Sequence, residues 1–400
     1  MRISSIEQFQ QGIDSILNQQ AKLNQTQLQL ATGKKVLKPS DDPAVATQLL
    51  NLSSLKANNL QYDRNINTAL NELELQESVL ASSGNVLQRV RELTIQANNA
   101  TQGSETRAAI ADEISNLADE LLQLANSKSP SGEYIFAGYN SRTPAFAKSD
   151  AGFVYQGDQG QRLLQVSEDT QLAVRDNGAD LFQGMMTGDG RFLLETPASN
   201  AGNGLVKMAS AIDAISDDFT MVFVQANADD PITYSVSGAA SGVVATGTYQ
   251  SGEAISFNGV SIEIAGSPVN GDSYQINRSV RQDVFQSVQS IADALLAGGD
   301  TAAQSSKLVN DLGQSISTMD QALEHLQSRR TLVGNRLQAL DTRASENADG
   351  LLRLERQTSE LNDLDFAEAV SRLNLQTTAL QAAQQSYIKI QGLSLFNYLR

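Results

Sequence analysis

Residues 33–44 read GKKVLKPSDDPA, and this short stretch decides how the chain folds near its N-terminus. Gly33 can take the left-handed backbone conformation that ends a helix, and Pro39 cannot continue one. Asp42 is a favoured N-cap residue, and Pro43 suits the first helical position because no amide hydrogen is needed there. The stretch therefore predicts the end of one helix, followed at once by the start of a second.

The charged residues of this stretch allow more than one reading. Lys34 and Lys35 sit where positive charge meets the unsatisfied carbonyl groups of the preceding helix. Together with Lys38 they are either solvated helix-end charges or contacts for an acidic neighbouring subunit. Asp41 and Asp42 can be read as a metal site, but capping of the second helix explains them more simply.

Apolar residues recur with alternating spacings of three and four on the outer side of this turn and again at the C-terminus. The first helix is predicted to span roughly 3–32, and its series is Ile6, Phe9, Ile13, Ile16, Gln20, Leu23, Gln27 and Leu30. The C-terminal series is Phe366, Ala369, Leu373, Gln376, Leu380, Ala383, Tyr387 and Ile390. Such sustained heptads favour coiled-coil packing of the two ends of the chain.

Two longer helical stretches carry the same rhythm. Every seventh residue from Val45 to Leu87 is apolar except Asn59. A second series runs from Val309 to Ala344, with Arg330 as its one charged member. We expect these stretches to form a helical bundle with a core of its own.

The middle of the chain has a different composition. Residues 131–280 hold 18 of the 28 glycines and 14 of the 21 aromatic residues, which is typical of short strands and tight turns. Strands are predicted at 133–138, 152–157 and 162–167, then at regular spacing up to residue 277, with one helix at 204–216. Asn258-Gly259 and Asn270-Gly271 are favoured turn pairs.

These patterns predict an α+β fold with three parts. Residues 1–42 and 365–400 form an inner pair of terminal helices, and residues 43–130 and 280–364 form an antiparallel helical bundle. Residues 131–279 form an inserted β-rich outer domain of sandwich or barrel type.

Composition excludes several classes of function. The formal charge of −16 argues against nucleic acid or an anionic membrane as the main partner. No stretch approaches the roughly 20 apolar residues that span a bilayer, and the start MRISSIEQFQQG is not that of a cleaved secretory signal. The absence of Cys excludes disulfides, thiolate metal sites and cysteine nucleophiles.

Little in the sequence supports catalysis. His325 is the only histidine, so the paired histidines of a zinc protease helix are absent. The glycine-rich stretches 157–160 and 188–190 read as tight turns, because no Lys-Ser or Lys-Thr pair follows them. We expect no catalytic residue, no metal site and no cofactor.

The two ends of the chain resemble a known family. LQLATGKKVLKPSDDPAVA (28–46) resembles the N-terminal signature of bacterial flagellins and their junction relatives, and LNLQTTALQAAQQSYIKIQGLSLFNYL (373–399) resembles the matching C-terminal segment. The stretches at 130–146 and 242–274 are similar to the hook-associated branch of that family, whose members join the flagellar hook to the filament.

The resemblance implies an extracellular structural adaptor of the bacterial flagellum. Such adaptors form a ring of identical subunits after export, without a cleaved signal, through the flagellar type III apparatus. The implied partners are further copies of the chain, the hook-side hook-associated protein, flagellin and an export chaperone.

The resemblance and the heptads together assign the assembly residues. The turn signature is Gly33, Lys34, Pro39, Asp41, Asp42 and Pro43. The interface positions are Ile6, Phe9, Ile13, Ile16, Leu23, Leu30, Phe366, Leu373, Leu380, Tyr387 and Ile390. Two alternatives stay open at this point: filament flagellin itself, and an adhesin or surface hydrolase carried by the β-rich insert.

Overall fold

The computed structural model describes residues 5–99, 103–149, 152–227 and 229–398 of a chain that divides into two compact units. We call Met1–Arg64 with Arg343–Arg400 the terminal unit, and Asn65–Thr342 the body. The three-part division predicted from composition has other boundaries and stays a prediction.

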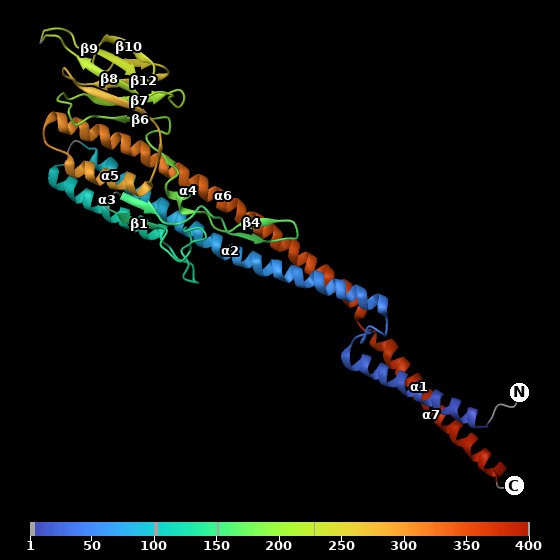
Figure 1. Cartoon of the computed structure of the whole chain (residues 1–400). Helices are drawn as coiled ribbons and strands as arrows, with labels where there is room; N and C mark the ends of the chain where they lie inside the picture. Colours follow the sequence, from blue (N-terminus) through green and yellow to red (C-terminus); the bar gives the residue numbers. More distant parts are fainter. Residues whose placement is uncertain (1–4, 100–102, 150–151, 228, 399–400) are drawn as a thin grey trace. The chain divides into compact units, whose positions relative to one another are not determined.

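Seven helices account for most of the described chain, and they are labelled in Figure 1. They are α1 (Ser5–Thr32), α2 (Pro43–Ala97), α3 (Ser104–Ala125), α4 (Gly178–Phe182), α5 (Val284–Ala297), α6 (Ala302–Asn362) and α7 (Phe366–Tyr398). The end of the first helix at residue 32 and the start of the second at residue 43 confirm what the turn residues predict.

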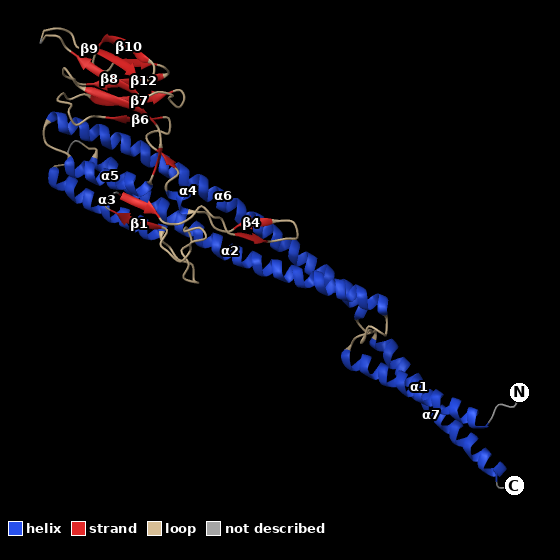
Figure 2. Cartoon of the chain, in the orientation of Figure 1, coloured by secondary structure: helices blue, strands red, loops and turns tan. Residues whose placement is uncertain are grey.

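Fourteen short strands lie between α3 and α5 in the described chain, shown in red in Figure 2. The first seven are β1 (Phe146–Ser149), β2 (Gly152–Tyr155), β3 (Leu163–Gln165), β4 (Gln171–Ala173), β5 (Met185–Met186), β6 (Phe192–Glu195) and β7 (Leu205–Ala211). The others are β8 (Phe219–Val224), β9 (Thr233–Gly238), β10 (Gly242–Thr248), β11 (Ala254–Phe257), β12 (Val260–Ala265), β13 (Ser273–Arg278) and β14 (Arg281–Gln282). Long helices from both ends with a β-rich insert confirm the predicted α+β class.

The helical part of the body has the core that its heptads predict. Leu73, Leu80 and Leu87 of α2 are fully buried, as are Leu312 and Met319 of α6. Helices α3 and α5 pack against each other and contribute further buried aliphatic residues to this part of the body. Burial of each large apolar side chain stabilises the fold by about 1.5–3 kcal/mol.

A buried ionic network joins α2, α6 and the segment after β4. Arg175 is almost fully buried and makes two 3.0 Å hydrogen bonds to the Glu72 carboxylate and a 2.9 Å ion pair with Glu133. Its neighbour Asp176 accepts two 2.9 Å hydrogen bonds from Arg336 and one of 2.8 Å from Gln76. Loss of one partner from such a pair would leave a buried charge unpaired, so the network fixes the register of the two helices.

An aromatic cluster lies where β1 meets the helices α4 and α5. Phe146 and Phe182 have ring centroids 5.7 Å apart, and each lies within 6 Å of Phe285. Phe136 packs edge-on against Phe182 at 5.5 Å.

The predicted strand at 133–138, which contains Phe136, is wrong. Only an isolated bridge forms there, between Tyr134 and Lys128. The amides of Ile135 and Gly178 bond to carbonyl groups across a loop instead of a neighbouring strand, and the Tyr155 hydroxyl donates to the Phe136 carbonyl. The apolar residues that suggested a strand are buried because they anchor this loop in the aromatic cluster.

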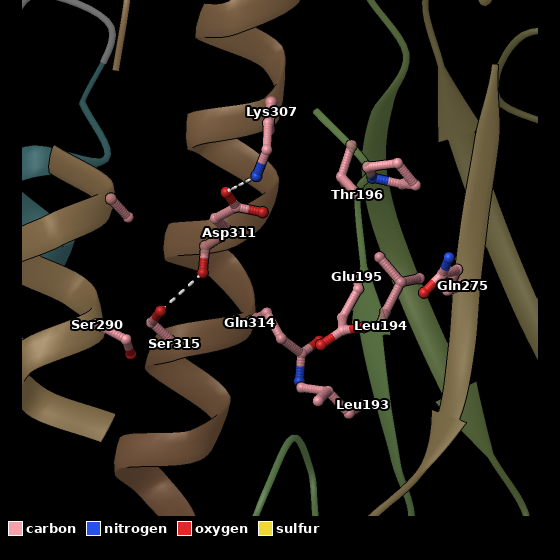
Figure 3. Close-up of a pocket in the computed structure, with 12 residues that line it drawn as sticks. Leu193, Leu194, Glu195, Thr196, Gln275, Ser290, Lys307, Asp311, Gln314 and Ser315 are labelled. Atoms are coloured by element: carbon pink, nitrogen blue, oxygen red, sulfur yellow. Dashed lines mark hydrogen bonds and ion pairs between the residues drawn. The ribbon is translucent and has the colours of Figure 1, made fainter. Parts of the chain in front are cut away.

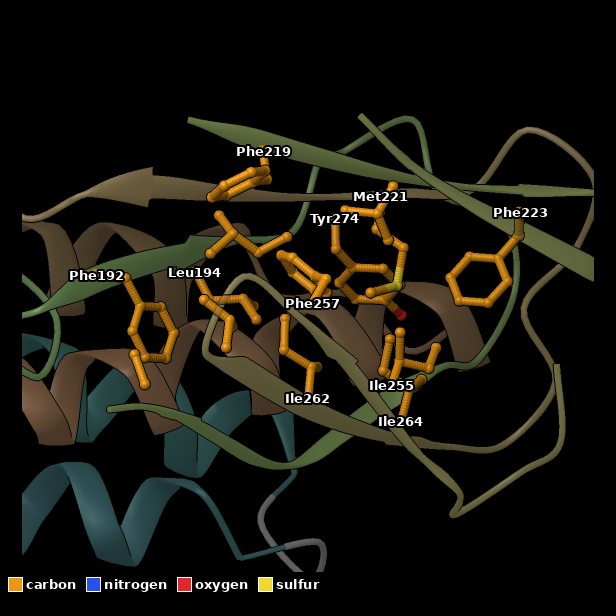
Figure 4. Packing of buried hydrophobic residues seen from close by; sticks show 14 residues of the cluster. Phe192, Leu194, Phe219, Met221, Phe223, Ile255, Phe257, Ile262, Ile264 and Tyr274 are labelled. Atoms are coloured by element: carbon orange, nitrogen blue, oxygen red, sulfur yellow. The ribbon is translucent and has the colours of Figure 1, made fainter. Parts of the chain in front are cut away.

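Eight of the described strands, β6 to β13, form two sheets around one core, which confirms the predicted sandwich- or barrel-like insert; the other six form the pairs β1-β2, β3-β4 and β5-β14. A five-stranded antiparallel sheet has the order β10-β9-β8-β13-β6, and a three-stranded sheet has the order β11-β12-β7. Their facing side chains, including Phe219, Met221, Phe257 and Tyr274, interdigitate between the sheets (Figure 4). Asn258 and Gly259 both have positive φ, as the predicted hairpin turn requires.

The predicted helix at 204–216 is also wrong. Residues 205–211 form β7, which pairs with β12 along its length around one register shift. The apolar residues of this stretch fit a helix or a strand about equally well, and pairing with β12 decides between them.

In the terminal unit α1 and α7 pack side by side and run antiparallel (Figure 1). The Tyr387 ring lies against Gly12, where an added Cβ would meet Cδ2 at 3.1 Å, and the Phe366 ring lies 3.7 Å from the corresponding point on Gly33. The two glycines are 21 residues apart, as are the two aromatic residues, so the helices keep one register throughout.

We expect Gly12→Val to separate the two terminal helices. Its branched side chain has no room beneath Tyr387, and such overpacking typically costs about 1–3 kcal/mol. The helical signal in circular dichroism should fall while the melting of the body is unchanged. Gly334→Val is the matched control, because Gly334 also lies in a helix but has no atom within 4 Å of an added Cβ. Equal spectra for both variants would contradict the predicted packing.

Candidate functional site

The turn between α1 and α2 is tied to the turn between α6 and α7. Gly33 has φ +69°, and its carbonyl accepts a 3.0 Å hydrogen bond from the Leu364 amide. Lys35 donates its amide to the Asn362 carbonyl at 2.7 Å, and Val36 donates to the Asn362 side chain at 3.2 Å. The two segments are more than 300 residues apart in the sequence, so these bonds fasten the segment that follows α1 to the segment that precedes α7.

Buried polar groups at the end of α1 complete this connection. Gln29 is nearly buried, and its amide group donates to the Lys35 carbonyl at 2.7 Å. Thr26 is also buried and donates to the Lys22 carbonyl one turn earlier in the helix. Both side chains therefore have the hydrogen bonds that burial demands.

The two aspartates of the turn stabilise the backbone. Asp41 accepts from the amides of Leu37 and Lys38 at 3.1 and 3.0 Å. Asp42 accepts from the amides of Ala44 and Val45, both at 3.1 Å, and so caps α2. Within the described ranges, no group of three or more His, Asp or Glu side chains is arranged to hold a metal ion.

The other residues of the turn signature have clear places. Lys34, Lys35 and Lys38 are exposed, and Lys34 also forms a backbone bridge with Asp363. Pro39 lies exposed in the loop, and Pro43 is the first residue of α2. A role for the lysines toward an acidic neighbour stays a prediction.

Six of the predicted interface residues line the contact between α1 and α7, which we call the seam. These half-buried residues are Ile16, Leu23, Leu30, Leu373, Leu380 and Tyr387. Ile13 and Phe366 are exposed instead. Ile6, Phe9 and Ile390 lie in these helices, but their side chains are outside the described set.

The seam on α1 is displaced from the predicted series. Gln20 and Gln27 are exposed, whereas Gly12, Gln19 and Thr26 take the positions between the apolar members. The predicted series misses them because it steps three and then four residues from Ile13, which places Gln20 and Gln27 between the apolar members. Their spacing of three or four from Ile16 and Leu23 was the available signal.

A second apolar face of α1 points away from α7. Ile13, Leu17 and Leu28 are exposed, Leu17 by 57%. A helix turns once every 3.6 residues, which places these three side chains within about 60° of one another and about 130° from the seam. We call Ile13, Leu17 and Leu28 the outer face of α1.

Helix α7 also exposes apolar side chains beside the seam. Phe366, Val370 and Ile388 are exposed along one flank, and Leu375 is 70% exposed on the other. Single exposed apolar residues are normal on protein surfaces, but here seven large ones recur along two paired helices that share one seam.

Charge is distributed unevenly between the two units. The terminal unit holds 13 basic and 12 acidic residues, whereas the body holds 16 basic and 33 acidic residues. The terminal unit is therefore close to neutral, and copies of it can approach one another without strong net repulsion.

The only histidine has a structural position in the body. His325 is half-buried, and its Nε2 lies 2.8 Å from the Asp180 carbonyl oxygen. Burial lowers the pKa of His325, which favours the neutral ring as the hydrogen-bond donor.

In the described part of the chain, no helix is both long and apolar enough to cross a membrane.

Comparison with known proteins identifies the family. Residues 4–141 match the model of the bacterial flagellin N-terminal helical region. The chain is 26% identical to flagellar hook-associated protein 3 of Salmonella typhimurium over the full length of both proteins, and 26% identical to the protein of the same name in Escherichia coli over 99% of both.

Solved structures agree with this match. The crystal structure of FlgL from Xanthomonas campestris is 33% identical, with a TM-score of 0.71, and the alignment covers 77% of this chain and 99% of the other. Flagellar hook associated protein-3 from Legionella pneumophila is 30% identical, with a TM-score of 0.74 and coverage of 78% and 98%. The chain therefore belongs to the FlgL family of flagellar hook-associated proteins.

Proposed function

We propose that this protein is a structural adaptor that joins the flagellar hook to the filament. Copies of the chain assemble as a ring through the terminal unit. The hook-side hook-associated protein is the neighbour on one side of the ring, and flagellin is the neighbour on the other. The protein acts by packing and has no catalytic role.

The observation that carries this proposal is the apolar surface of the terminal unit. Two paired helices bury one seam and leave the outer face of α1 and both flanks of α7 in water. Covering each large apolar side chain gains about 1.5–3 kcal/mol, so neighbouring subunits gain stability by packing there. The near neutrality of this unit removes an electrostatic obstacle to that packing.

The proposed role also requires that the chain reach the outside of the cell. We propose export as an unfolded chain through the flagellar type III apparatus, with a chaperone covering the apolar C-terminal helix until assembly. Two helices with one narrow seam cost little to unfold, which suits passage through a narrow channel.

The alternative that the chain is filament flagellin is not favoured. Flagellins of Vibrio parahaemolyticus, Vibrio cholerae and Vibrio anguillarum are 22–24% identical to the chain, lower than the hook-associated proteins. No specific observation favours an adhesin or a hydrolase.

Deletion of the gene tests the adaptor role directly. We expect cells that retain hooks, lack filaments and release flagellin monomers into the medium, because the filament has no base on which to grow. Electron microscopy and immunoblots of the medium provide the readout. Full-length filaments on the mutant cells would refute the proposal.

A charge on the outer face of α1 tests the surface itself. We expect Leu17→Asp to prevent incorporation into the flagellum while the monomer stays folded, because the carboxylate is solvated in the monomer and becomes buried on assembly. Gln27→Asp is the control, since Gln27 is exposed on the same helix. Incorporation is measured by motility and by immunoblots of purified flagella. Normal incorporation of Leu17→Asp would argue against this face as an interface.

A further inference from the structure

A cleft in the body lies between the β-rich insert and the helices α5 and α6. It has a volume of about 400 Å³, and residues 193–197 form one wall (Figure 3). Successive side chains of a strand point to opposite faces of its sheet, so a cleft against one face would be lined by alternate residues. Five consecutive residues of the β6 segment line this one, together with Gln275 of the paired strand β13, so the cleft takes in both the edge of β6 and the sheet face that carries Glu195 and Gln275.

That edge of β6 has no partner strand. In its sheet β6 is paired only with β13 and is the last strand. Among the described residues, 193–196 make no backbone–backbone hydrogen bond outside that ladder. The free N–H and C=O groups of an edge strand are a ready template for another extended chain. Pro197 ends the template, because it lacks the amide hydrogen.

The opposite wall is one face of α6. Lys307, Asp311, Gln314 and Ser315 follow the spacing of a single helical face, and Gln314 reaches across toward Leu193 (Figure 3). Ser290 and Ala294, one turn apart on α5, complete this side. A second hollow of about 430 Å³ shares Ala294, Lys307 and Asp311 and lengthens the cleft.

The charges of the cleft favour a basic occupant. Lys307 and Asp311 form an ion pair and balance each other. Glu195 on β6 and Asp293 in the lengthened part then leave the cleft acidic, within a body that holds twice as many acidic as basic residues. Glu195 accepts a 2.8 Å hydrogen bond from Asn277 of β13, which holds its carboxylate on the sheet face over the β6–β13 pair.

We propose that this cleft binds an extended, lysine- or arginine-containing peptide segment of a partner protein, which adds to β6 as a further antiparallel or parallel strand. The peptide backbone pairs with the free edge, and its basic side chains face Glu195 and Asp293. The cleft volume lies in the range of pre-formed ligand sites and accommodates a few residues of extended chain.

Binding of a synthetic peptide to the full chain tests this proposal. The probe is a fluorescein-labelled peptide of sequence Lys-Val-Lys-Val-Lys-Val, followed by fluorescence anisotropy. We expect saturable binding that weakens as salt is added, because charge attraction contributes. A peptide with the same side chains but N-methylated at alternate residues should bind about tenfold more weakly, since it cannot donate to the strand edge.

Two substitutions locate the site. Ser315→Trp fills the cleft and should weaken binding about tenfold, whereas Ser317→Trp, on the same helix but outside the cleft, should leave it unchanged. Glu195→Gln should weaken binding of the lysine peptide about threefold and leave a Ser-Val peptide unaffected. Circular dichroism checks that each variant is folded.

Three results would overturn the proposal. They are no saturable binding up to about 1 mM peptide, equal binding of the N-methylated peptide, and equal binding by wild type and Glu195→Gln. Binding of acidic and basic peptides with equal affinity would likewise show that the cleft charges do not select the ligand.

Discussion

The structure depends on an apolar surface that the chain cannot cover by itself. Two helices side by side bury only the narrow strip where they touch, and α1 and α7 carry large apolar residues well outside that strip. A body with two cores of its own needs no help to stay folded, whereas the terminal unit gains stability each time another molecule packs on it. Under the proposed adaptor role, this contrast lets one chain be both a folded monomer and a component of an assembly.

The two turns of the terminal unit position this surface. Asn362 and Leu364 bond to the segment that follows α1, so the end of α1 and the start of α7 are fixed together by the backbone. Asp42 and Asp365 then start the helices that follow, each by accepting two amide hydrogens. The signature at residues 28–46 therefore has a structural role: its residues hold the turn together and cap α2.

Most of the helical architecture can be predicted from the sequence, because helix signals are local. Gly33, Asp42 and Pro43 mark a helix end and a helix start, and the heptads of α2 and α6 identify their buried faces correctly. The errors occur where distant contacts decide the outcome. Residues 204–216 become a strand because β12 lies beside them, and residues 133–138 become a loop because the aromatic cluster holds Phe136.

The seam between α1 and α7 is predictable only in part. Heptad counting finds Ile16, Leu23 and Leu30, but it does not show that Thr26 and Gly12 lie on the same seam, since neither is apolar. It also does not separate the seam from the outer face of α1, because both carry apolar residues at helical spacing. Only the position of α7 distinguishes the two faces.

Amide hydrogen exchange on the full chain, dilute and then assembled, tests the central claim most directly. We predict that in the dilute chain the amides of α1 and α7 exchange much faster than those of the buried stretch of α2 between Ile66 and Leu93. On assembly, the amides of α1 and α7 should become protected. Equal protection of α1, α7 and this stretch of α2 in the dilute chain would contradict the account, because the terminal helices would then need no neighbours.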